Sequence, residues 1–318
     1  VTNSCVKNIL SNIFFTLQRV NMIYEIYHET KFDYAGLVTF SHNIARLKPK
    51  DSNTQKLLEY SLKIEPTPYE TSEFIDYFEN TNNYMLIRES HKNLKVIATS
   101  RVERIKEEID KELNLIKEIK TTVKELKERL STYNPNDVLA KYFLFETDSI
   151  PMPSIEIKKY VLESFNENRN IIDATNEFMS RIFNDFKFVS GFSDITTPIE
   201  MIFKEKKGVC QDFAQFAISA LRSIGIPTRY VSGYIQTLPT EGKEKLFGAD
   251  ASHAWFSIYI PDFGWADFDP TNNKIPNEEY IILGYGRDYL DISPLKGVVQ
   301  SSGNSSLGVK VNVKILAD

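Results

Sequence analysis

The chain is poor in the residues from which disulfide frameworks and metal centres are built. Its 318 residues include two cysteines, Cys5 and Cys210, and four histidines. Two cysteines separated by more than half the chain do not indicate a disulfide framework and are compatible with a reducing compartment. No pair of histidines has metal-ligand spacing, and no glycine-rich phosphate loop follows an expected strand. We therefore expect neither a metal nor a cofactor.

An excess of basic residues and long hydrophobic runs are also missing. The net charge is −5, whereas a nucleic-acid binder would usually carry a basic stripe, so we expect no nucleic-acid partner. Residues 1–21 form an N-terminal extension whose short apolar patch is interrupted by polar residues. It makes a poor signal peptide and is too short and polar to span a membrane. We expect no membrane partner and a cytoplasmic location, with export left open; a translation start at Met22 is equally compatible.

What the chain does contain is typical of a globular protein, with 42% apolar and 25% charged residues. Residues 22–102 are strand-like runs broken by prolines and asparagine-rich turns, which indicates a β-sandwich. From 103 to 130, apolar residues recur every three or four positions among eight acids and eight bases. This pattern predicts one long charged helix with a single apolar stripe. The stripe either packs on the rest of the molecule or forms a coiled-coil homodimer through 103–130.

One cysteine lies at a predicted helix entrance. Apolar residues recur at helical spacing from Phe213 to Ile224, and Gly225 and Pro227 end the pattern, so Cys210 falls in the first turn. There the unpaired backbone amides and the positive end of the helix dipole stabilise a thiolate. The plain alternative is a small buried hydrophobic side chain, which is what a lone cysteine usually is.

A histidine and an aspartate follow on a predicted β-hairpin. If residues 261–263 form the turn, Ile260 pairs with Gly264, and His253 becomes the diagonal neighbour of Asp269 on one face of the hairpin. Such a diagonal spans roughly 7 to 8 Å, within reach of the two side chains. Taken singly, His253 could be a structural strand histidine and Asp269 a turn residue. Together with Cys210, they make a nucleophile, a base and an orienting acid.

These segments resemble a known family. The runs GVCQDFAQFAISALRSIGIPTRYVSGY and SHAWFSIYIPDFGWADFDPTNN are similar to the core of the transglutaminase-like superfamily, whose members use a Cys-His-Asp triad on a papain-like fold. By position, the resemblance implies that Cys210 is the nucleophile, His253 the general base and Asp269 the orienting acid. No metal or cofactor is implied.

The resemblance extends beyond this core. Residues 22–102 are similar to the β-rich N-terminal domain of bacterial members, and the runs GYGRDYLDISPLKG and LGVKVNVKI are similar to the end of those proteins. One departure is DYFEN, in which Glu79 stands where the family more often has glycine. The implied fold is α+β, a papain-like transglutaminase core preceded by a β-sandwich and a long helical connector. The expected segments are an extension (1–21), the N-terminal β-domain (22–102), the connector (103–135), the catalytic core (136–295) and a C-terminal strand segment (296–318).

Further site residues are expected around the triad. The backbone amide of Cys210 is the simplest oxyanion donor, and the side-chain candidates are Gln211 and Tyr230. The polar loop 238–252 leads into the histidine strand, so it rims the site either as a lid or as a variable surface loop.

Five residues are candidates for contacting substrate. Trp255 and Trp265 flank the hairpin and serve either substrate stacking or packing. Arg287, Asp288 and Tyr289, in the run GRDY, either bind substrate or form a salt-bridged turn.

The predicted function is a thiol hydrolase, a cysteine protease or amidase acting on a peptide or protein substrate through a thioester. An acyltransferase is the first alternative, although the sequence shows no dedicated amine pocket and no calcium-binding acid cluster of the EF-hand type. The second alternative is a non-catalytic peptide- or protein-binding module. Three intact triad residues argue against loss of turnover.

Overall fold

The computed structural model describes residues 21–236 and 252–316, and two packed antiparallel sheets form its N-terminal part. The strand order of the first sheet is β14 (Ser305–Leu316), β1 (Met22–Val38), β6 (His91–Arg104) and β3 (Gln55–Glu65). That of the second is β13 (Leu295–Gln300), β2 (Phe40–Ala45), β5 (Thr81–Ile87) and β4 (Glu70–Ile75). Buried residues such as Val38, Met85, Ile87, Leu94 and Val96 fill the space between the sheets. The predicted β-sandwich is confirmed.

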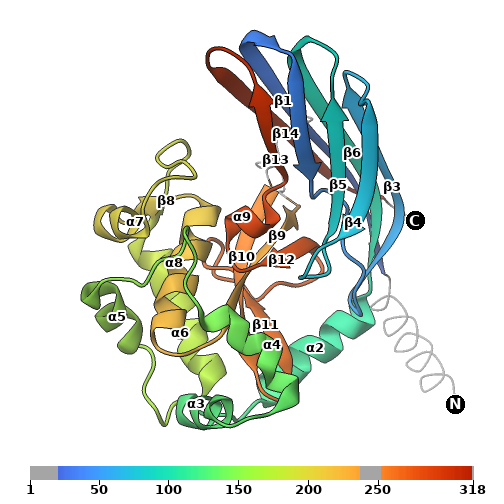
Figure 1. Cartoon of the computed structure of the whole chain (residues 1–318). Helices are drawn as coiled ribbons and strands as arrows, with labels where there is room; N and C mark the ends of the chain where they lie inside the picture. Colours follow the sequence, from blue (N-terminus) through green and yellow to red (C-terminus); the bar gives the residue numbers. More distant parts are fainter. Residues whose placement is uncertain (1–20, 237–251, 317–318) are drawn as a thin grey trace, which may run out of the picture.

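The last two strands of the chain complete this N-terminal sandwich. β14 pairs with β1 from Tyr34–Ser305 to Ile23–Leu316, and β13 pairs with β2. Figure 1 shows the red C-terminal strands beside the blue N-terminal ones. Each sheet thus contains a strand from the end of the chain. The segment boundaries expected from the sequence stay predictions.

The connector is two helices, so the prediction of one long helix was wrong. α2 (Lys106–Glu118) ends before Ile119, and α3 (Val123–Ser131) begins after Thr122. The Thr122 hydroxyl accepts a hydrogen bond from the Glu125 amide, and the Glu125 carboxylate accepts one from the Thr122 amide. This capping box starts a new helix because it satisfies backbone donors that a continuous helix would have used.

The apolar stripe of the connector is used within the chain. Buried positions recur along both helices and belong to the interior of the same molecule: Ile109, Ile116, Val123, Leu126 and Leu130. The stripe therefore packs on the rest of the molecule, the first of the two alternatives. Homodimer formation stays a prediction.

The remainder of the chain packs helices against an antiparallel sheet. The sheet order is β11 (Gly264–Phe268), β10 (Ser252–Ile260), β9 (Thr228–Ile235) and β12 (Tyr280–Gly286). The larger helices are α5 (Ile155–Leu162), α6 (Ile171–Asp185), α7 (Ile199–Glu205) and α8 (Cys210–Ser223). Shorter elements are η1 (Pro135–Asp137), α4 (Val138–Lys141), η2 (Tyr142–Leu144), α9 (Tyr289–Ile292) and the parallel pair β7 (Lys187–Phe188) and β8 (Lys207–Gly208). This is the predicted α+β core.

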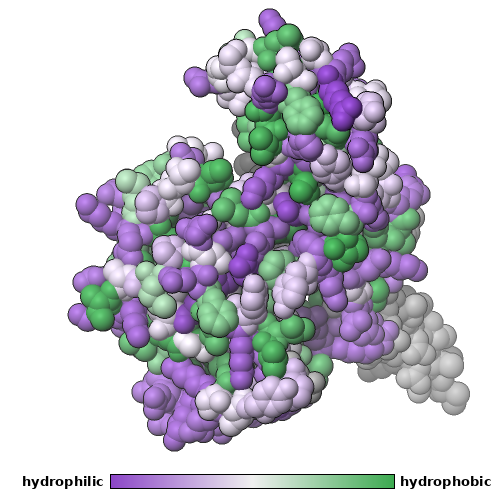
Figure 2. Space-filling view, in the orientation of Figure 1, coloured by the Kyte–Doolittle hydropathy of each residue, from purple (hydrophilic) through white to green (hydrophobic). Residues whose placement is uncertain are grey.

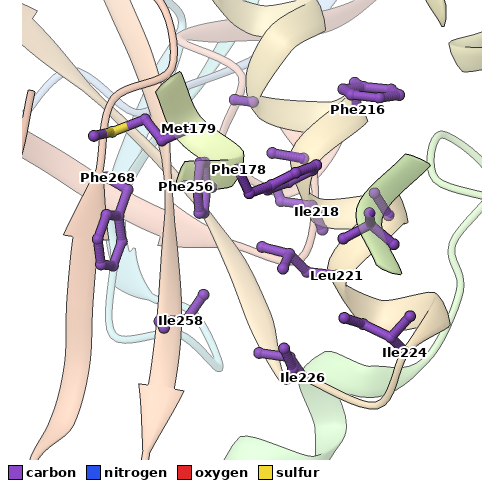
Figure 3. Close-up of a cluster of buried hydrophobic side chains, with 14 of the residues drawn as sticks. Phe178, Met179, Phe216, Ile218, Leu221, Ile224, Ile226, Phe256, Ile258 and Phe268 are labelled. Carbon is purple, nitrogen blue, oxygen red and sulfur yellow. The ribbon is translucent and has the colours of Figure 1, made fainter. Parts of the chain in front are cut away.

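One hydrophobic cluster joins the helices to this sheet. Buried members of this cluster come from both layers (Figure 3): Phe216 and Leu221 of α8, Phe178 of α6, Phe256 of β10 and Phe268 of β11. The ring centres of Phe178 and Phe216 are 6.3 Å apart, and those of Phe256 and Phe268 are 5.7 Å apart. Phe256 and Phe268 are directly opposite each other in the hairpin, so their side chains share one face of the sheet. The cluster holds α8 against the sheet. Cys210 lies in the first turn of this helix and packs against the same cluster.

Two side-chain amides attach the sandwich to the core. Gln55 donates to the carbonyl of Ile282 and accepts from its amide, both at 2.8 Å. Asn80 donates to the carbonyl of Tyr285 at 2.7 Å and accepts from its amide at 2.9 Å. Since β12 is an edge strand with unpaired backbone groups, these amides act as a partial neighbouring strand.

The turn before Asn80 contains Glu79, the residue that stands where the family more often has glycine. Glu79 adopts a φ of 61°, in the left-handed region. Glycine reaches this region without steric cost, whereas an L-residue is disfavoured there by roughly 1–2 kcal/mol. Glu79 therefore occupies this turn at a cost in backbone strain.

No helix within residues 21–236 and 252–316 is long and apolar enough to cross a membrane. On the face shown in Figure 2, hydrophilic residues predominate and hydrophobic ones are scattered among them.

Candidate active site

The segment before Cys210 is held tightly against the first turn of α8. The buried carboxylate of Asp212 accepts hydrogen bonds from the Val209 amide at 2.7 Å and from the Ser193 hydroxyl. A Cβ at Gly208 would lie 2.8 Å from that carboxylate, so only glycine fits. Burial outweighs these hydrogen bonds and raises the pKa of Asp212. The carboxylate thus organises the helix entrance that presents Cys210.

The hairpin has the register expected for a three-residue turn. Ile260 pairs with Gly264 and Phe256 with Phe268, which confirms the predicted pairing. His253 Nε2 then lies 2.7 Å from Asp269 Oδ2, and both side chains are buried. The two residues meet because the turn length decides which side chains share a face.

The carboxylate of Asp269 is held by several donors. Oδ2 also accepts from Tyr280 Oη at 2.8 Å and Asn272 Nδ2 at 2.7 Å, while Oδ1 accepts from the Thr271 amide at 2.8 Å. Burial alone would raise the pKa of Asp269, but these hydrogen bonds and the one with His253 lower it below its ordinary value. Asp269 is therefore an ionised, immobile acceptor.

Two of these donors were missed by the sequence reasoning. Asn272 follows the acid in DPTNN, and its proximity in the chain was a usable signal. Tyr280 begins β12, two strands away from β10 in the sheet, and nothing local in the sequence links it to Asp269.

His253 lies between the carboxylate and the thiol. Burial disfavours the charged imidazolium, but the hydrogen bonds with Asp269 and with Cys210 outweigh burial and raise the pKa of His253. Since Nε2 is engaged by Asp269, the other ring nitrogen is left for Cys210. The arrangement can accept a proton from the thiol and stabilise the resulting ion pair.

Tyr230 is the better placed of the two side-chain oxyanion candidates. It is buried in β9, and burial together with the nearby Cys210 raises its pKa well above the ordinary value. Its phenol therefore stays protonated beside the thiol and is available as a donor. Gln211 is partly exposed in the first turn of α8.

Trp255 lies beneath the site instead of lining it. It is fully buried, donates from Nε1 to Asp267 at 2.9 Å, and packs edge-on against Tyr280 with ring centres 5.3 Å apart. Its ring centre is 5.9 Å from that of His253. A side chain without exposed surface cannot stack on a substrate, so Trp255 has the packing role.

Trp265 lies at the opposite end of the hairpin. It pairs with Tyr259, which is six residues from His253, or about 20 Å along the strand. Its ring packs against Phe143 and under the Arg229 guanidinium. Of the two roles considered for the tryptophans, the contacts of both match packing, and neither side chain is placed to stack on a substrate.

The run GRDY divides between two roles. Arg287 forms a two-point ion pair with Asp291, with Nε–Oδ2 and Nη2–Oδ1 distances of 2.8 and 3.0 Å. Asp288 is buried and accepts from the amides of Leu290 and Asp291 at the start of α9. These contacts match the salt-bridged turn. Tyr289 packs against Tyr230, the residue beside Cys210, with the two ring centres 6.3 Å apart.

Two expectations concern other regions. The predicted rim loop 238–252 lies, except for Ser252 in β10, outside the described residues. In the described part of the chain, no group of three or more His, Cys, Asp or Glu residues is arranged to hold a metal ion.

Comparisons with known proteins agree with this architecture. Residues 24–103 match the bacterial transglutaminase-like N-terminal region, and residues 159–270 match the transglutaminase-like superfamily. An uncharacterized protein of Mycobacterium tuberculosis is 31% identical over 297 residues, which covers 91% of this chain and 92% of that protein. The protein-glutamine gamma-glutamyltransferase of Pseudomonas aeruginosa is 33% identical over 102 residues, 30% of this chain and 15% of that enzyme.

A solved structure shares the fold. The crystal structure of a candidate cysteine protease from Cytophaga hutchinsonii superposes with a TM-score of 0.72 at 20% identity, covering 94% of this chain and 92% of that one. The full-length similarity to the mycobacterial protein, the two family matches and the shared fold lead to one conclusion. The chain belongs to the transglutaminase-like superfamily.

Proposed function

We propose that the protein is a thiol hydrolase that cleaves peptide or peptide-like amide bonds through Cys210, His253 and Asp269. The observation that carries the proposal is the hydrogen-bonded line from the buried Asp269 carboxylate through the buried His253 imidazole to the partly exposed Cys210 thiol at the entrance of α8. Such a line is the arrangement that activates a cysteine nucleophile.

In the first half of the reaction, His253 accepts the Cys210 proton and the thiolate attacks the amide carbon. A C–S bond forms, and the carbonyl oxygen becomes an oxyanion. The Cys210 backbone amide and the Tyr230 phenol are the donors available to it. His253 then gives its proton to the amine, the C–N bond breaks, and a thioester remains.

In the second half, water attacks the thioester while His253 accepts a proton from it. The C–S bond breaks, the carboxylic acid leaves, and the Cys210 thiol regains the proton. Asp269 keeps its negative charge throughout, because its hydrogen bonds hold its pKa low. It orients the imidazole and stabilises the imidazolium formed in each half.

Acyl transfer to an amine is the second candidate. The similarity of 102 residues to a protein-glutamine gamma-glutamyltransferase favours it. The two reactions share the thioester and differ in the group that attacks it. Efficient transfer requires an acceptor held near the thioester, since positioning is worth several orders of magnitude in effective concentration.

The deciding experiment uses a peptide pool in ¹⁸O-labelled water with a fluorescent primary amine at millimolar concentration. Wild-type protein is compared with Cys210→Ser, and products are identified by mass spectrometry. We expect ¹⁸O-labelled acids that depend on Cys210. Labelled amides forming faster than acids would establish a transferase. No difference between wild type and Cys210→Ser would leave a non-catalytic binding module.

A further inference from the structure

The Lys206 ammonium lies in a cage of three aromatic rings. Its Nζ is 3.8 Å from the ring centre of Phe203 and 4.4 Å from the ring centres of Tyr160 and Phe186. A cation within about 6 Å of a ring centre is attracted by the negative face of the ring, and here three rings act on one charge. Within the part of the chain that the structure describes, this nitrogen makes no ion pair or hydrogen bond, so the rings are its main contacts.

The cage is part of the side-chain packing around the nucleophile helix. Phe203 of α7 stacks on Phe216 of α8, with ring centres 5.7 Å apart and an angle of 12° between the rings. Phe186 and Tyr160 also lie against Phe216, with ring centres at 4.9 and 5.9 Å. Tyr160 Oη donates to the Asp185 carboxylate at 2.7 Å, which fixes that ring. The rings are thus held around the ammonium by α5, α6, α7 and α8 (Figure 1).

A lysine at this position is unfavourable for the backbone. Lys206 follows α7 with a φ of 51° and a ψ of 40°, in the left-handed region. Glycine is the residue most often found at such a helix end, because it reaches this region without steric cost. The ammonium has also lost solvent, and burial lowers the pKa of Lys206 despite the nearby Asp185. Both costs indicate that the side chain contributes through its charge within the cage.

The backbone runs directly from Lys206 to the nucleophile. After Lys206 come the two residues of β8, the N-cap Val209 and then Cys210. Asp212 holds the α8 end of this segment through the Val209 amide. At the α7 end, the Lys206 carbonyl accepts from the Lys187 amide at 2.8 Å. The position of the thiol therefore depends on an anchor at each end.

A small displacement of the thiol matters for the reaction. The imidazole of His253 can take the Cys210 proton only within hydrogen-bonding reach. A misplacement of about 1 Å can cost about a hundredfold in rate. We propose that the caged Lys206 ammonium fixes the position of the Cys210 thiol, which makes Lys206 a positioning residue for the proposed reaction. This inference rests on the proposed function, because Cys210 is the nucleophile of that reaction.

The first test measures thiol reactivity in a Cys5→Ser parent. Lys206→Met removes the charge of the side chain, and we expect it to slow iodoacetamide labelling of Cys210 about tenfold at neutral pH. Such a change corresponds to about 1.4 kcal/mol, within the range of a desolvated cation–π contact. The pH midpoint of labelling should also move towards that of a free thiol, about 8.5. Lys206→Arg keeps a cation and should recover most of the rate.

Lys204→Met is the matched control, because Lys204 is an exposed lysine in the last turn of the same helix. It should label like the parent. Equal rates for Lys206→Met and the parent at every pH from 5 to 9 would overturn the inference.

Lys206→Gly separates positioning from stability. Glycine relieves the left-handed backbone but supplies no cation. This variant should therefore have a higher Tm than Lys206→Met and still label about tenfold more slowly than the parent. If the labelling rates of the Met, Arg and Gly variants merely follow their Tm values, Lys206 acts on stability alone and the inference is wrong.

Fluorinated phenylalanines in place of Phe203 test the role of the ring face. Fluorine withdraws electrons from the ring and weakens its attraction for a cation. Mono-, di- and trifluorinated phenylalanine should slow labelling stepwise in the parent and leave the rate unchanged in Lys206→Met. The same response in both proteins would assign the effect to packing and overturn the inference.

The outcomes separate this inference from the proposed function. Fast labelling of the parent with no effect of Lys206→Met removes the anchor and leaves the hydrolase. If the parent labels no faster than a free cysteine, the thiol chemistry fails and hydrogen exchange decides the anchor. The backbone amides of residues 207–210 should then exchange about tenfold faster in Lys206→Met than in the parent, which would support the anchor by itself. Equal exchange would remove it.

Discussion

Tyr280 donates a 2.8 Å hydrogen bond to Oδ2 of Asp269, the same oxygen that His253 Nε2 contacts at 2.7 Å. Tyr280 begins β12, and two residues later Ile282 is bonded through its backbone to Gln55 of the sandwich. The position of the acid therefore depends on a strand that the N-terminal sheets help to hold. This connection gives the β-sandwich a structural link to the candidate active site.

We expect Tyr280→Phe to slow iodoacetamide labelling of Cys210 about tenfold. Loss of one donor loosens the hold on Asp269, although Asn272 and the Thr271 amide remain, and costs about 1–3 kcal/mol of orientation and stability. Labelling is followed by mass spectrometry from pH 5 to 9. The matched control is Tyr259→Phe, because the Tyr259 hydroxyl donates at 2.7 Å to Asp137, outside the triad. Equal rates in the Tyr280 variant and wild type would show that the phenol does not position the acid.

The triad predicts an ordered series of thiol reactivities. In a Cys5→Ser background, wild-type Cys210 should react with iodoacetamide near neutral pH much faster than a free cysteine, since the imidazole generates a thiolate. His253→Ala should abolish the enhancement, whereas Asp269→Asn should only weaken it.

Circular dichroism must show that the three proteins fold alike. If His253→Ala labels as fast as wild type at every pH from 5 to 9, the histidine is not the partner of the thiol.

The raised pKa of His253 predicts a sign for the pH dependence of stability. A group whose pKa is higher in the folded state stabilises that state. The stabilisation is fully present at pH values below the pKa of histidine in the unfolded chain, about 6.5. It is lost as the pH rises through the pKa of His253 in the folded protein. The free energy of unfolding of wild type relative to His253→Gln should therefore decline from about pH 6.5 upward. Urea denaturation at a series of pH values measures it, and a difference that grows with pH would contradict the assignment.

Glu79→Gly should stabilise the protein by about 0.5–1 kcal/mol. Removing a left-handed L-residue relieves roughly 1–2 kcal/mol, part of which the greater backbone entropy of glycine offsets. Glu70→Gly, in the extended strand β4, is the control and should destabilise instead. Thermal unfolding of both variants gives the comparison, and a lower Tm for Glu79→Gly would show that the φ of 61° is not strained.

Much of the candidate site followed from local patterns. Helical spacing after Cys210 places the thiol in a first turn, and an odd turn length brings His253 and Asp269 to one face. Both depend on interactions between residues close in the chain, so a short stretch of sequence carries the information. The break between α2 and α3 had an equally local signal, the capping box of Thr122 and Glu125, which the apolar periodicity concealed.

The sequence by itself determined the helix entrance, the hairpin and the alternating strands, because hydrogen-bonding partners and side-chain faces there are set within a few residues. Only the tertiary structure decided which strands became neighbours: β14 beside β1, and Tyr280 of β12 against Asp269. It also decided that Trp255 is buried and that Trp265 lies far from the thiol. Such choices depend on which surfaces bury one another once the whole chain is compact, and no local pattern specifies them.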